Sequence, residues 1–270
     1  MDLRVAAGKR LCARYSGADV AQPSSSDLFP QINGLPEITA GELSESTLAA
    51  GLLHHGALLV RGLYSSPEVS MLQQMAMAQG QAGRWDELSS EAWAHTVFTL
   101  LELYNNNGLL EAVRPYLGGV PVMLAERTKL RQRRGGKDNL AAIPWHQDVN
   151  FYGKKTYAVN CWAAVTSCGE DNPGLGIVPC RTEQRIGWSE KDGIAPLYFG
   201  SSMADSAFEQ LTKRYPAVYP VLQPGDALIF DEMTMHCTAP RPWKQKLQTV
   251  TISWFFRASG FPDRGIPLAV

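Results

Sequence analysis

The chain has 270 residues, 45% of them hydrophobic, and its 25 basic and 26 acidic residues give a formal net charge of −1. This length can bury one sizeable core, and so balanced a charge gives no reason to expect nucleic-acid binding or attachment to a membrane surface. The five cysteines are scattered and lack C-x-x-C spacing, which argues against a disulfide framework or a zinc knuckle. With no apolar leader and no run of ~20 apolar residues, a cytoplasmic protein is expected.

The N-terminal part of the sequence predicts an irregular arm followed by a helix and a strand. Residues 1–40 are rich in Ser, Pro and Gly, which favours an extended arm or a lid. Leucines at helical spacing predict a helix over 39–56, with Gly56 as its natural stop. The short apolar run 57–63 is best explained as a strand.

Three further helices are predicted before residue 120. The strongest signal lies in 65–79, where Ser66 can cap the helix and Pro67 suits its first position. The other two helices are expected over 89–104 and around 107–116.

Residues 120–256 have a different texture, in which β-branched and aromatic runs are separated by Gly and Pro. Several short strands with turn signals are typical of a β-sandwich or barrel. The runs are VPVMLAERTKL, TYAVNCWAAVT, LGIVP, AVYPVLQ, DALIFD and QTVTISWFF. Since no internal repeat is found, residues 1–270 are predicted to form a single domain of α+β type, mainly β, with a β-barrel core and flanking N-terminal helices.

Two ionisable side chains, His146 and Asp148, lie two residues apart in the otherwise apolar, aromatic or amide segment 141–153. In a strand, residues i and i+2 point to the same face, so the imidazole and the carboxylate would lie side by side. The only histidine downstream is His236, at the end of the predicted strand DALIFDEMTMH. Two histidines and a carboxylate on one face form the facial triad that suits non-haem Fe(II) and leaves positions open for a cosubstrate and O2.

The residues alone leave other interpretations open. A short H-x-D pattern recurs by chance, and a His and an Asp hydrogen-bonded in a loop would give the same sequence. Zinc accepts the same ligands, although a catalytic zinc site needs only one open position. The surroundings favour a functional site, because Trp145 and Gln147 flank the histidine and a Pro-Gly turn precedes the strand that ends at His236.

Three longer motifs match one known family. The pentapeptide PWHQD is complete at 144–148, the segment EDNPGLGIVP at 170–179 corresponds to a family segment, and PGD, FD and His236 follow in the expected order. The run from Gly56 to Glu68 echoes the family's N-terminal pattern. On these motifs the chain resembles the phytanoyl-CoA dioxygenase-like family of Fe(II)- and 2-oxoglutarate-dependent oxygenases, over residues 50 to 256.

The resemblance implies a double-stranded β-helix, which is a jelly-roll or cupin-like core flanked by helices. It implies that His146, Asp148 and His236 bind Fe(II) as the catalytic centre and that 2-oxoglutarate chelates the iron. With O2 as the oxidant, succinate and CO2 are then the co-products of substrate oxidation, usually hydroxylation. Because relatives that halogenate lack the carboxylate ligand, Asp148 argues for hydroxylation or another oxidation and against halogenation.

The sequence departs from the family in the residue that pairs with the distal carboxylate of 2-oxoglutarate. The family usually has an Arg about ten or eleven residues after the second metal-binding His, because a guanidinium grips a carboxylate with two hydrogen bonds. Here Lys246 stands in that region, and no Arg occurs within 242–256. Lys246 is one candidate for the missing cation. The other candidates are Arg127 and Lys129, which share a strand face if LAERTKL is a strand. For each cation taken alone, a solvent-exposed position at a strand end is the simpler explanation.

Three residues near the motifs are candidates for contact with the substrate. Tyr152 follows the PWHQD segment closely and is the first choice for a wall of the substrate pocket, and Trp145 is a second aromatic candidate. Core packing is the simpler explanation of such aromatic residues. Arg181 lies near the opening used by substrates in relatives and could contact an acidic group, although a surface position is the simpler expectation.

Three functions therefore fit the sequence. The leading hypothesis is an oxygenase acting on a small-molecule substrate. The absence of the usual Arg favours a cupin-type metal-dependent enzyme or binding protein that does not use 2-oxoglutarate. A non-catalytic metal-binding or interaction module that has kept the fold is the third. The preference for a small molecule over a protein substrate rests on analogy between folds.

Overall fold

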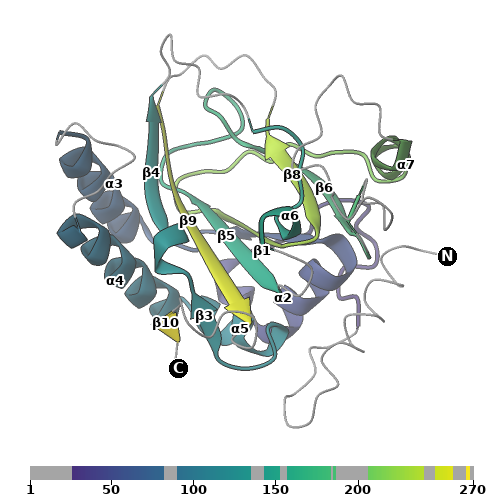
Figure 1. Cartoon of the computed structure of the whole chain (residues 1–270), viewed down its shortest axis with the longest axis horizontal. Helices are drawn as coiled ribbons and strands as arrows, with labels where there is room; N and C mark the ends of the chain where they lie inside the picture. The colour runs from purple at the N-terminus through teal and green to yellow at the C-terminus, as the bar shows by residue number, and fades with distance from the viewer. Residues whose placement is uncertain are drawn as a thin grey trace.

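Two β-sheets face each other, and helices cover the outer side of the larger one (Figure 1). The structure, a computed structural model, describes residues 26–81, 90–134, 143–152, 157–183, 185–186, 206–239, 247–257 and 266–267. In these ranges no helix has both the length and the apolar character needed to cross a membrane. The predicted order, with helices first and a β-rich body after them, is confirmed.

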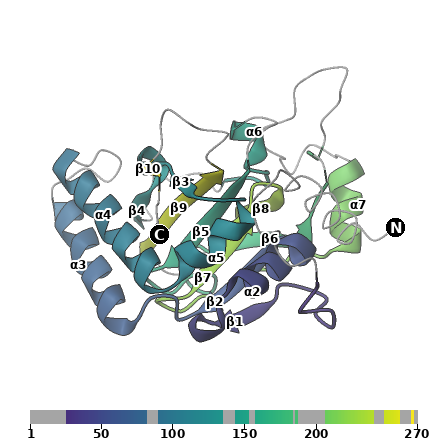
Figure 2. The same ribbon diagram turned by 90° about the horizontal axis from the view of Figure 1, so that it is seen from below.

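The helices of the N-terminal half form the outer layer of the molecule (Figure 2). They are η1 (Ala40–Glu42), α2 (Glu45–Ala50), the π-helical turn η2 (Gly51–His55), α3 (Ser66–Gln81), α4 (Ser90–Asn106) and α5 (Leu109–Tyr116). Helix α5 packs on α2 and α4, while α3 and α4 lie against strand β4 (Lys129–Arg134). The three helices predicted between residues 64 and 120 are thus confirmed, with small shifts at their ends.

Helix α3 is capped one residue earlier than predicted. The carbonyl of Ser65 accepts the first helical hydrogen bond, from Val69 N at 2.9 Å. Glu68 reaches back and accepts hydrogen bonds from the backbone N–H and the hydroxyl of Ser65, at 2.6 and 2.7 Å. A carboxylate reaches the residue three positions before it, so Ser65 is the cap and Ser66 is the first helical residue.

The single helix predicted over 39–56 is broken. Ser44 caps α2 by accepting a hydrogen bond from Thr47 N at 3.3 Å, which separates α2 from η1. Side chains of this kind compete for backbone groups and favour helix ends over helix interiors. Gly56 does end the segment as predicted, with a φ of 76° in the left-handed region.

The larger sheet runs in the order β1-β2-β7-β5-β9-β3-β10, with β4 also paired to β9. All its pairings are antiparallel except that of β1 with β2. The remaining strands of this sheet are β1 (Glu37–Thr39), β2 (Ala57–Arg61), β3 (Pro121–Met123), β5 (Ala158–Ala164), β7 (Ala227–Asp231), β9 (Leu247–Arg257) and β10 (Ile266–Pro267). The smaller sheet joins β6 (Leu175–Arg181) to β8 (Thr234–Thr238), and α7 (Ser206–Arg214) lies beyond it.

The end of the arm predicted to be irregular is a strand. Strand β1 pairs with β2 at the edge of the larger sheet, and its central Ile38 is buried between two exposed neighbours. The alternation of one apolar residue over three positions is too short a signal to predict a strand. Residues 1–25 of the arm lie outside the described ranges.

Two predicted strands are each divided in two. The run VPVMLAERTKL is interrupted by the 3-10 turn η3 (Ala125–Arg127), which separates β3 from β4. The run DALIFDEMTMH turns after Asp231, because Asp231 Oδ1 accepts hydrogen bonds from Met233 N at 2.9 Å and Thr234 Oγ1 at 2.8 Å. This turn carries the chain from the larger sheet to the smaller one, so His236 lies in a different sheet from β7.

The run AVYPVLQ, also predicted as a strand, makes only isolated bridges. Val218 pairs with Ile177, and Leu222 pairs with Cys168. Pro220 lies between them and has no backbone N–H to donate to a ladder.

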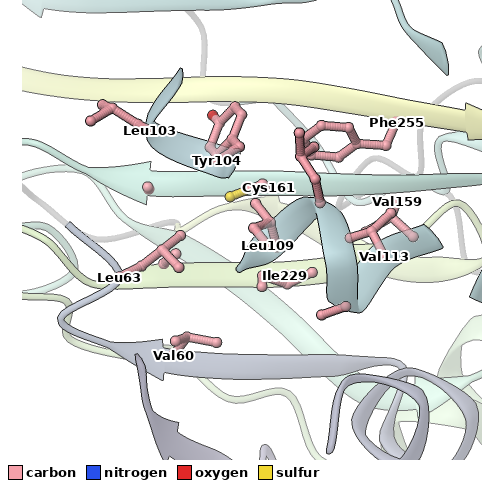
Figure 3. Close-up of a cluster of buried hydrophobic side chains, with 14 of the residues drawn as sticks. Val60, Leu63, Leu103, Tyr104, Leu109, Val113, Val159, Cys161, Ile229 and Phe255 are labelled. Carbon is pink, nitrogen blue, oxygen red and sulfur yellow. The ribbon is translucent and has the colours of Figure 1, made fainter. Parts of the chain in front are cut away.

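The two faces of the larger sheet have different neighbours, because side chains alternate along each strand. Val159 and Cys161 of β5 point to the helical layer and pack with residues of α4 and α5 in the main hydrophobic core (Figure 3). Asn160 and Trp162, the residues between and after them, line a cavity on the opposite face. The sheet thus separates an apolar core from the candidate functional site.

Candidate metal centre

His146 and His236 lie directly opposite each other in a short antiparallel bridge. The backbone N–H of each residue donates to the carbonyl of the other, at 2.9 and 3.0 Å. Side chains of directly opposite residues lie on the same face, and the two imidazole centroids are 4.2 Å apart. This pairing between β8 and the segment 143–146 fixes the two rings side by side.

Asp148 completes the group from a turn, and the strand geometry predicted for it is wrong. It lies just before the short helix α6 (Val149–Tyr152), where Phe151 N donates to its carbonyl at 2.9 Å. Its Oδ1 is 3.6 Å from His146 Nε2, and its Oδ2 is 3.5 Å from His236 Nε2. One ligand atom from each residue lies within 4.8 Å of the others. The structure therefore brings the three sequence-predicted ligands together.

The outer nitrogen of each imidazole is held by a backbone carbonyl. His146 Nδ1 lies 2.7 Å from the carbonyl oxygen of Pro144, and His236 Nδ1 lies 3.0 Å from that of Thr234. A carbonyl only accepts hydrogen bonds, so both Nδ1 atoms must carry the proton. Both Nε2 atoms then present a lone pair toward Asp148, which is the tautomer that metal-binding histidines adopt.

Burial favours the neutral form of both imidazoles. Burial lowers the pKa of His236 well below its usual value, and the charge of a protonated His146 would lower it further. Burial also lowers the pKa of His146, although the hydrogen bond to Pro144 opposes this change. Neutral imidazoles are the form that binds metal ions.

The buried carboxylate of Asp148 would be stabilised by a positive charge close to it. Burial raises the pKa of Asp148 well above its usual value, and the charges of Glu232 and Asp231 raise it further, while a hydrogen bond from Asn160 opposes the rise. Among the described residues, Asp148 Oδ2 has no hydrogen-bond partner. A divalent cation at this point would satisfy both the oxygen and the charge.

These donors fit Fe(II). Two imidazole nitrogens and one carboxylate on one side of a cavity are the ligand set of non-haem Fe(II) oxygenases, whereas Ca²⁺ and Mg²⁺ prefer oxygen ligands alone. The ring of Phe151 packs edge-on to His146, with centroids 5.6 Å apart, and that of Phe230 lies 4.5 Å from His236. The two metal-binding imidazoles thus pack against apolar aromatic rings.

The three residues open into a cavity of about 380 Å³ between the two sheets. Its walls come from β4, β5, β7 and β9 of the larger sheet and from β6 and β8 of the smaller one. The lining combines aromatic side chains, including Trp162 and Trp254, with three basic side chains, Arg127, Lys129 and Arg131. The cavity is therefore apolar around the ligands and positively charged along β4.

Two of the three predicted cosubstrate residues lie at this cavity. Arg127 ends the turn η3 and Lys129 begins β4, and both are exposed residues that line the cavity. The prediction that they share one strand is wrong, because the turn η3 separates Arg127 from β4. Lys246 lies outside the described residues. Sequence reasoning missed Arg131, although the same alternation of side chains places it on the face of Lys129 two residues later.

Of the two aromatic substrate candidates, Trp145 is not among the described residues that line the cavity. Trp145 points away from it and packs against Phe208 and Tyr219, with centroid distances of 5.6 and 6.5 Å. Its role is therefore packing against the helix α7, the simpler of the two explanations. Tyr152 ends α6, and its side chain lies outside what the structure describes.

Arg181 is buried, so the surface position expected for it is wrong. It is only 2% exposed and pairs with Asp231 and, at 3.4 Å, with Glu232. Asp231 also accepts a hydrogen bond from the hydroxyl of Tyr116 in α5, at 3.1 Å. Arg181 is not among the residues that line the cavity, and its guanidinium instead links the end of β6 to the β7–β8 turn.

Gln147 was quoted in the sequence motif without a role, and the structure gives it one. Its side chain is fully buried. The amide nitrogen donates to Thr182 Oγ1 and to the carbonyl of Met233, both at 2.7 Å, and the amide oxygen accepts from Ile186 N at 2.8 Å. One side chain between two metal-binding positions thus ties together three separate segments of the chain.

Comparison with known families agrees with this geometry. The sequence matches the family described as phytanoyl-CoA dioxygenase (PhyH) over residues 52–241, which is most of the chain. No curated protein matches the sequence.

Solved structures share the fold at low sequence identity. EctD from S. alaskensis, with 2-oxoglutarate and 5-hydroxyectoine, is 17% identical with a TM-score of 0.60, covering 91% of this chain and 86% of its own. The epimerase SnoN, in complex with Fe³⁺, α-ketoglutarate and nogalamycin RO, is 14% identical with a TM-score of 0.59 and coverages of 84% and 96%. The carbocyclase SnoK is 12% identical with a TM-score of 0.55 and coverages of 87% and 96%. The predicted jelly-roll fold is confirmed.

Proposed function

The chain belongs to the phytanoyl-CoA dioxygenase family of Fe(II)- and 2-oxoglutarate-dependent oxygenases, and from this premise we propose that it hydroxylates a small-molecule substrate at an iron held by His146, Asp148 and His236. The observation that carries the proposal is the convergence of the three ligand atoms, within 4.8 Å of one another, on the wall of a cavity of about 380 Å³.

Bound Fe(II) and 2-oxoglutarate supply a two-electron oxidant from O2, so that a substrate C–H becomes C–OH while 2-oxoglutarate leaves as succinate and CO2. The residues of this chain prepare the site for that chemistry. The carbonyls of Pro144 and Thr234 hold the imidazoles with their Nε2 lone pairs toward the metal. Asp148 supplies a negative charge that the cation offsets.

Hydroxylation is favoured over halogenation by Asp148. His146, Asp148 and His236 would hold the metal through three protein ligands, and the carboxylate would take the position that a halide needs. The same fold carries proteins described as an epimerase and a carbocyclase. Which oxidation takes place therefore depends on how the substrate lies in the cavity, and it is determined by identifying the product.

A small molecule is the proposed substrate because the ligands face a cavity of about 380 Å³ between the two sheets. We further propose that the whole chain is one catalytic domain, since the core continues from the helical layer into the larger sheet. A cytoplasmic location is proposed from the scattered cysteines of the sequence; those in the described ranges form no disulfide and are buried.

The test uses purified protein loaded with Fe(II), 2-oxoglutarate and a small-molecule extract under ¹⁸O2. We expect a product one oxygen atom heavier than its precursor, with the added oxygen derived from O2, and formed only when both Fe(II) and 2-oxoglutarate are present. Asp148→Ala should form none. A product oxidised without an added oxygen would contradict hydroxylation, and turnover that is independent of 2-oxoglutarate would contradict the oxygenase mechanism itself.

A further inference from the structure

The cavity must neutralise a dicarboxylate without the Arg usual in the family. Burying the distal carboxylate of 2-oxoglutarate needs a cation or several hydrogen-bond donors. The segment 242–256, which includes nearly all of β9, contains no Arg. Besides Lys246, a cationic side chain from another element that reaches the same end of the cavity can serve as the partner.

The pairing of β4 with β9 brings Arg131 to that place. Arg131 lies opposite Val250, near the start of β9, and Lys129 lies opposite Ile252. Ile252 and Trp254 both line the cavity, so the residues of β4 that pair with this face point into the cavity as well. Arg131 thus lies on the strand next to β9, opposite a residue three positions after Leu247, the start of β9 where the family's Arg is expected.

Arg131 also differs from the other two cations of the cavity. It is half-buried, whereas Arg127 and Lys129 are exposed. Burial raises the pKa of Cys168 to about 12, and the charge of Arg131 opposes this rise. Cys168 follows the end of β5, so the charge of Arg131 lies near that end of the strand. A half-buried cation interacts more strongly with a carboxylate than an exposed one does.

A second donor lies between Arg131 and the metal ligands. Trp162 is 3% exposed and lines the cavity, and its indole N–H has no hydrogen-bond partner among the described residues. Buried donors without partners are rare in native structures and need an explanation. An acceptor bound in the cavity would provide the missing partner.

The spacing along β5 fits a five-carbon diacid. Asn160 hydrogen-bonds to Asp148 at the metal centre, and Trp162 lies two residues further along the same face, which is roughly 7 Å in a strand. Trp162 pairs with Ile252, and Arg131 lies two residue pairs further along β9, opposite Val250. A long Arg side chain can span the remaining distance.

We propose that Arg131 and Trp162 together bind the distal carboxylate of 2-oxoglutarate, Arg131 through its charged guanidinium fork and Trp162 through its indole N–H. This assignment rests on the proposed function, because it requires 2-oxoglutarate to chelate a metal at His146, Asp148 and His236. It replaces the Arg that the sequence lacks with a residue from the adjacent strand and a donor from β5.

The experiment measures binding by calorimetry under anaerobic conditions, with protein loaded with Mn(II) so that no turnover occurs. The two ligands are 2-oxoglutarate and 2-oxovalerate, which has the same chelating end and carbon chain but no distal carboxylate. Arg131→Met should weaken 2-oxoglutarate binding about 10- to 100-fold and leave 2-oxovalerate binding unchanged. Trp162→Phe, which removes only the N–H donor, should weaken 2-oxoglutarate binding about 3- to 10-fold.

Matched variants test the assignment against its competitors. Lys129→Met and Arg127→Met remove exposed cations of the same cavity, and Lys246→Met removes the other candidate; each should leave the preference for 2-oxoglutarate over 2-oxovalerate intact. Arg131→Lys retains the charge without the planar guanidinium. Its affinity for 2-oxoglutarate should lie between those of wild type and Arg131→Met, and it replaces Arg131→Met in the test if that variant does not fold.

The outcomes separate this inference from the proposed function. If Trp162→Phe and the Arg131 variants bind 2-oxoglutarate as wild type does, or if Lys246→Met alone abolishes the preference, the inference is overturned while the oxygenase function stands. An equal loss of both ligands would assign Arg131 to the metal centre, which also overturns it. Wild type that binds neither ligand would contradict the proposed function.

Discussion

Gln147 illustrates how a single side chain can set the geometry of a metal centre that it does not touch. Its amide is bonded to the end of β6 at Thr182, to the β7–β8 turn at Met233 and to Ile186. The β7–β8 turn leads directly to His236, and Gln147 itself stands between the other two ligands. Partners outside the ligand set orient metal ligands and affect metal affinity strongly.

Gln147→Met should weaken Fe(II) binding about 10- to 100-fold, because it keeps the volume of the side chain but removes all three hydrogen bonds. The affinity is measured by anaerobic competition with a chelator. Gln132→Met is the matched control, since Gln132 is also buried but donates to Thr249 on the helical side of the sheet. Equal Fe(II) affinity in the two variants would show that Gln147 only supports the fold.

Asp148 is expected to reduce the stability of the metal-free protein. Its buried Oδ2 lacks a hydrogen-bond partner among the described residues, and leaving such an atom unsatisfied costs about 1–3 kcal/mol. Asp148→Ala should therefore lose Fe(II) binding while unfolding, without metal, at a temperature no lower than that of wild type. Thermal unfolding in the presence of a chelator measures this, and a large drop in Tm would mean that the carboxylate supports the fold directly.

At the scale of elements, the predictable features are those carried by local chemistry. The helices after residue 64, the strands β5, β6 and β7, and the stop at Gly56 follow from spacing, caps and glycine. The breaks do not. Asp231 ends β7 because its carboxylate accepts hydrogen bonds from Met233 N and Thr234 Oγ1. Such side-chain hydrogen bonds favour a turn over a continued strand, and the hydrophobic pattern of the sequence does not reveal them. The broken strand is what moves His236 into the second sheet.

The junction between the turn η2 and β6 depends on Gly56. A Cβ at this residue would lie 2.8 Å from Arg181 N and 2.8 Å from the carbonyl carbon of Cys180, and its φ is 76°. Gly62 has a similar φ, 65°, but nothing within 4 Å of the same position. The two glycines therefore share the backbone strain and differ only in the close approach of β6.

Gly62→Ala should cost about 1–2 kcal/mol of folding free energy from the backbone conformation alone. Gly56→Ala should cost about 1–3 kcal/mol more, since β6 must also shift. Urea denaturation of the two metal-free variants measures the difference. Equal losses would mean that β6 does not pack on Gly56 as the structure describes.

At the scale of the whole molecule, a buried charged cluster joins the layers. Arg181 of β6 pairs with Asp231 and Glu232 of the β7–β8 turn, and Tyr116 of α5 donates to Asp231. Burial and the charge of Asp231 raise the pKa of Glu232 to about 7, although Arg181 works against this. The helical layer, the larger sheet and the smaller sheet thus meet at one ion pair network behind the metal centre.

Arg181→Met should destabilise the metal-free protein by about 3–5 kcal/mol, because it leaves buried carboxylates without their cation. Arg61→Met provides the comparison. Arg61 also pairs with two acids, Glu37 and Asp226, but its side chain is 33% exposed, so a loss of about 1 kcal/mol or less is expected. Similar urea midpoints for the two variants would contradict the structural role assigned to Arg181.

The site was predictable where the sequence places its chemistry in a motif. His146, Asp148 and His236 could be identified because their flanking residues are distinctive. Arg131 could have been found from its spacing to Lys129, but the half-burial that distinguishes it depends on the register of β4 against β9. The Trp162 N–H without a partner among the described residues and the burial of Arg181 depend on packing between distant segments, which no local pattern records.

The most direct test of the central claim is an anaerobic titration of the Fe(II)-loaded protein with 2-oxoglutarate, followed through the weak visible charge-transfer band of the chelate. The account predicts a band that saturates at one equivalent of 2-oxoglutarate and is absent from Asp148→Ala. Iron that binds to the wild-type protein without any band on addition of 2-oxoglutarate would contradict it.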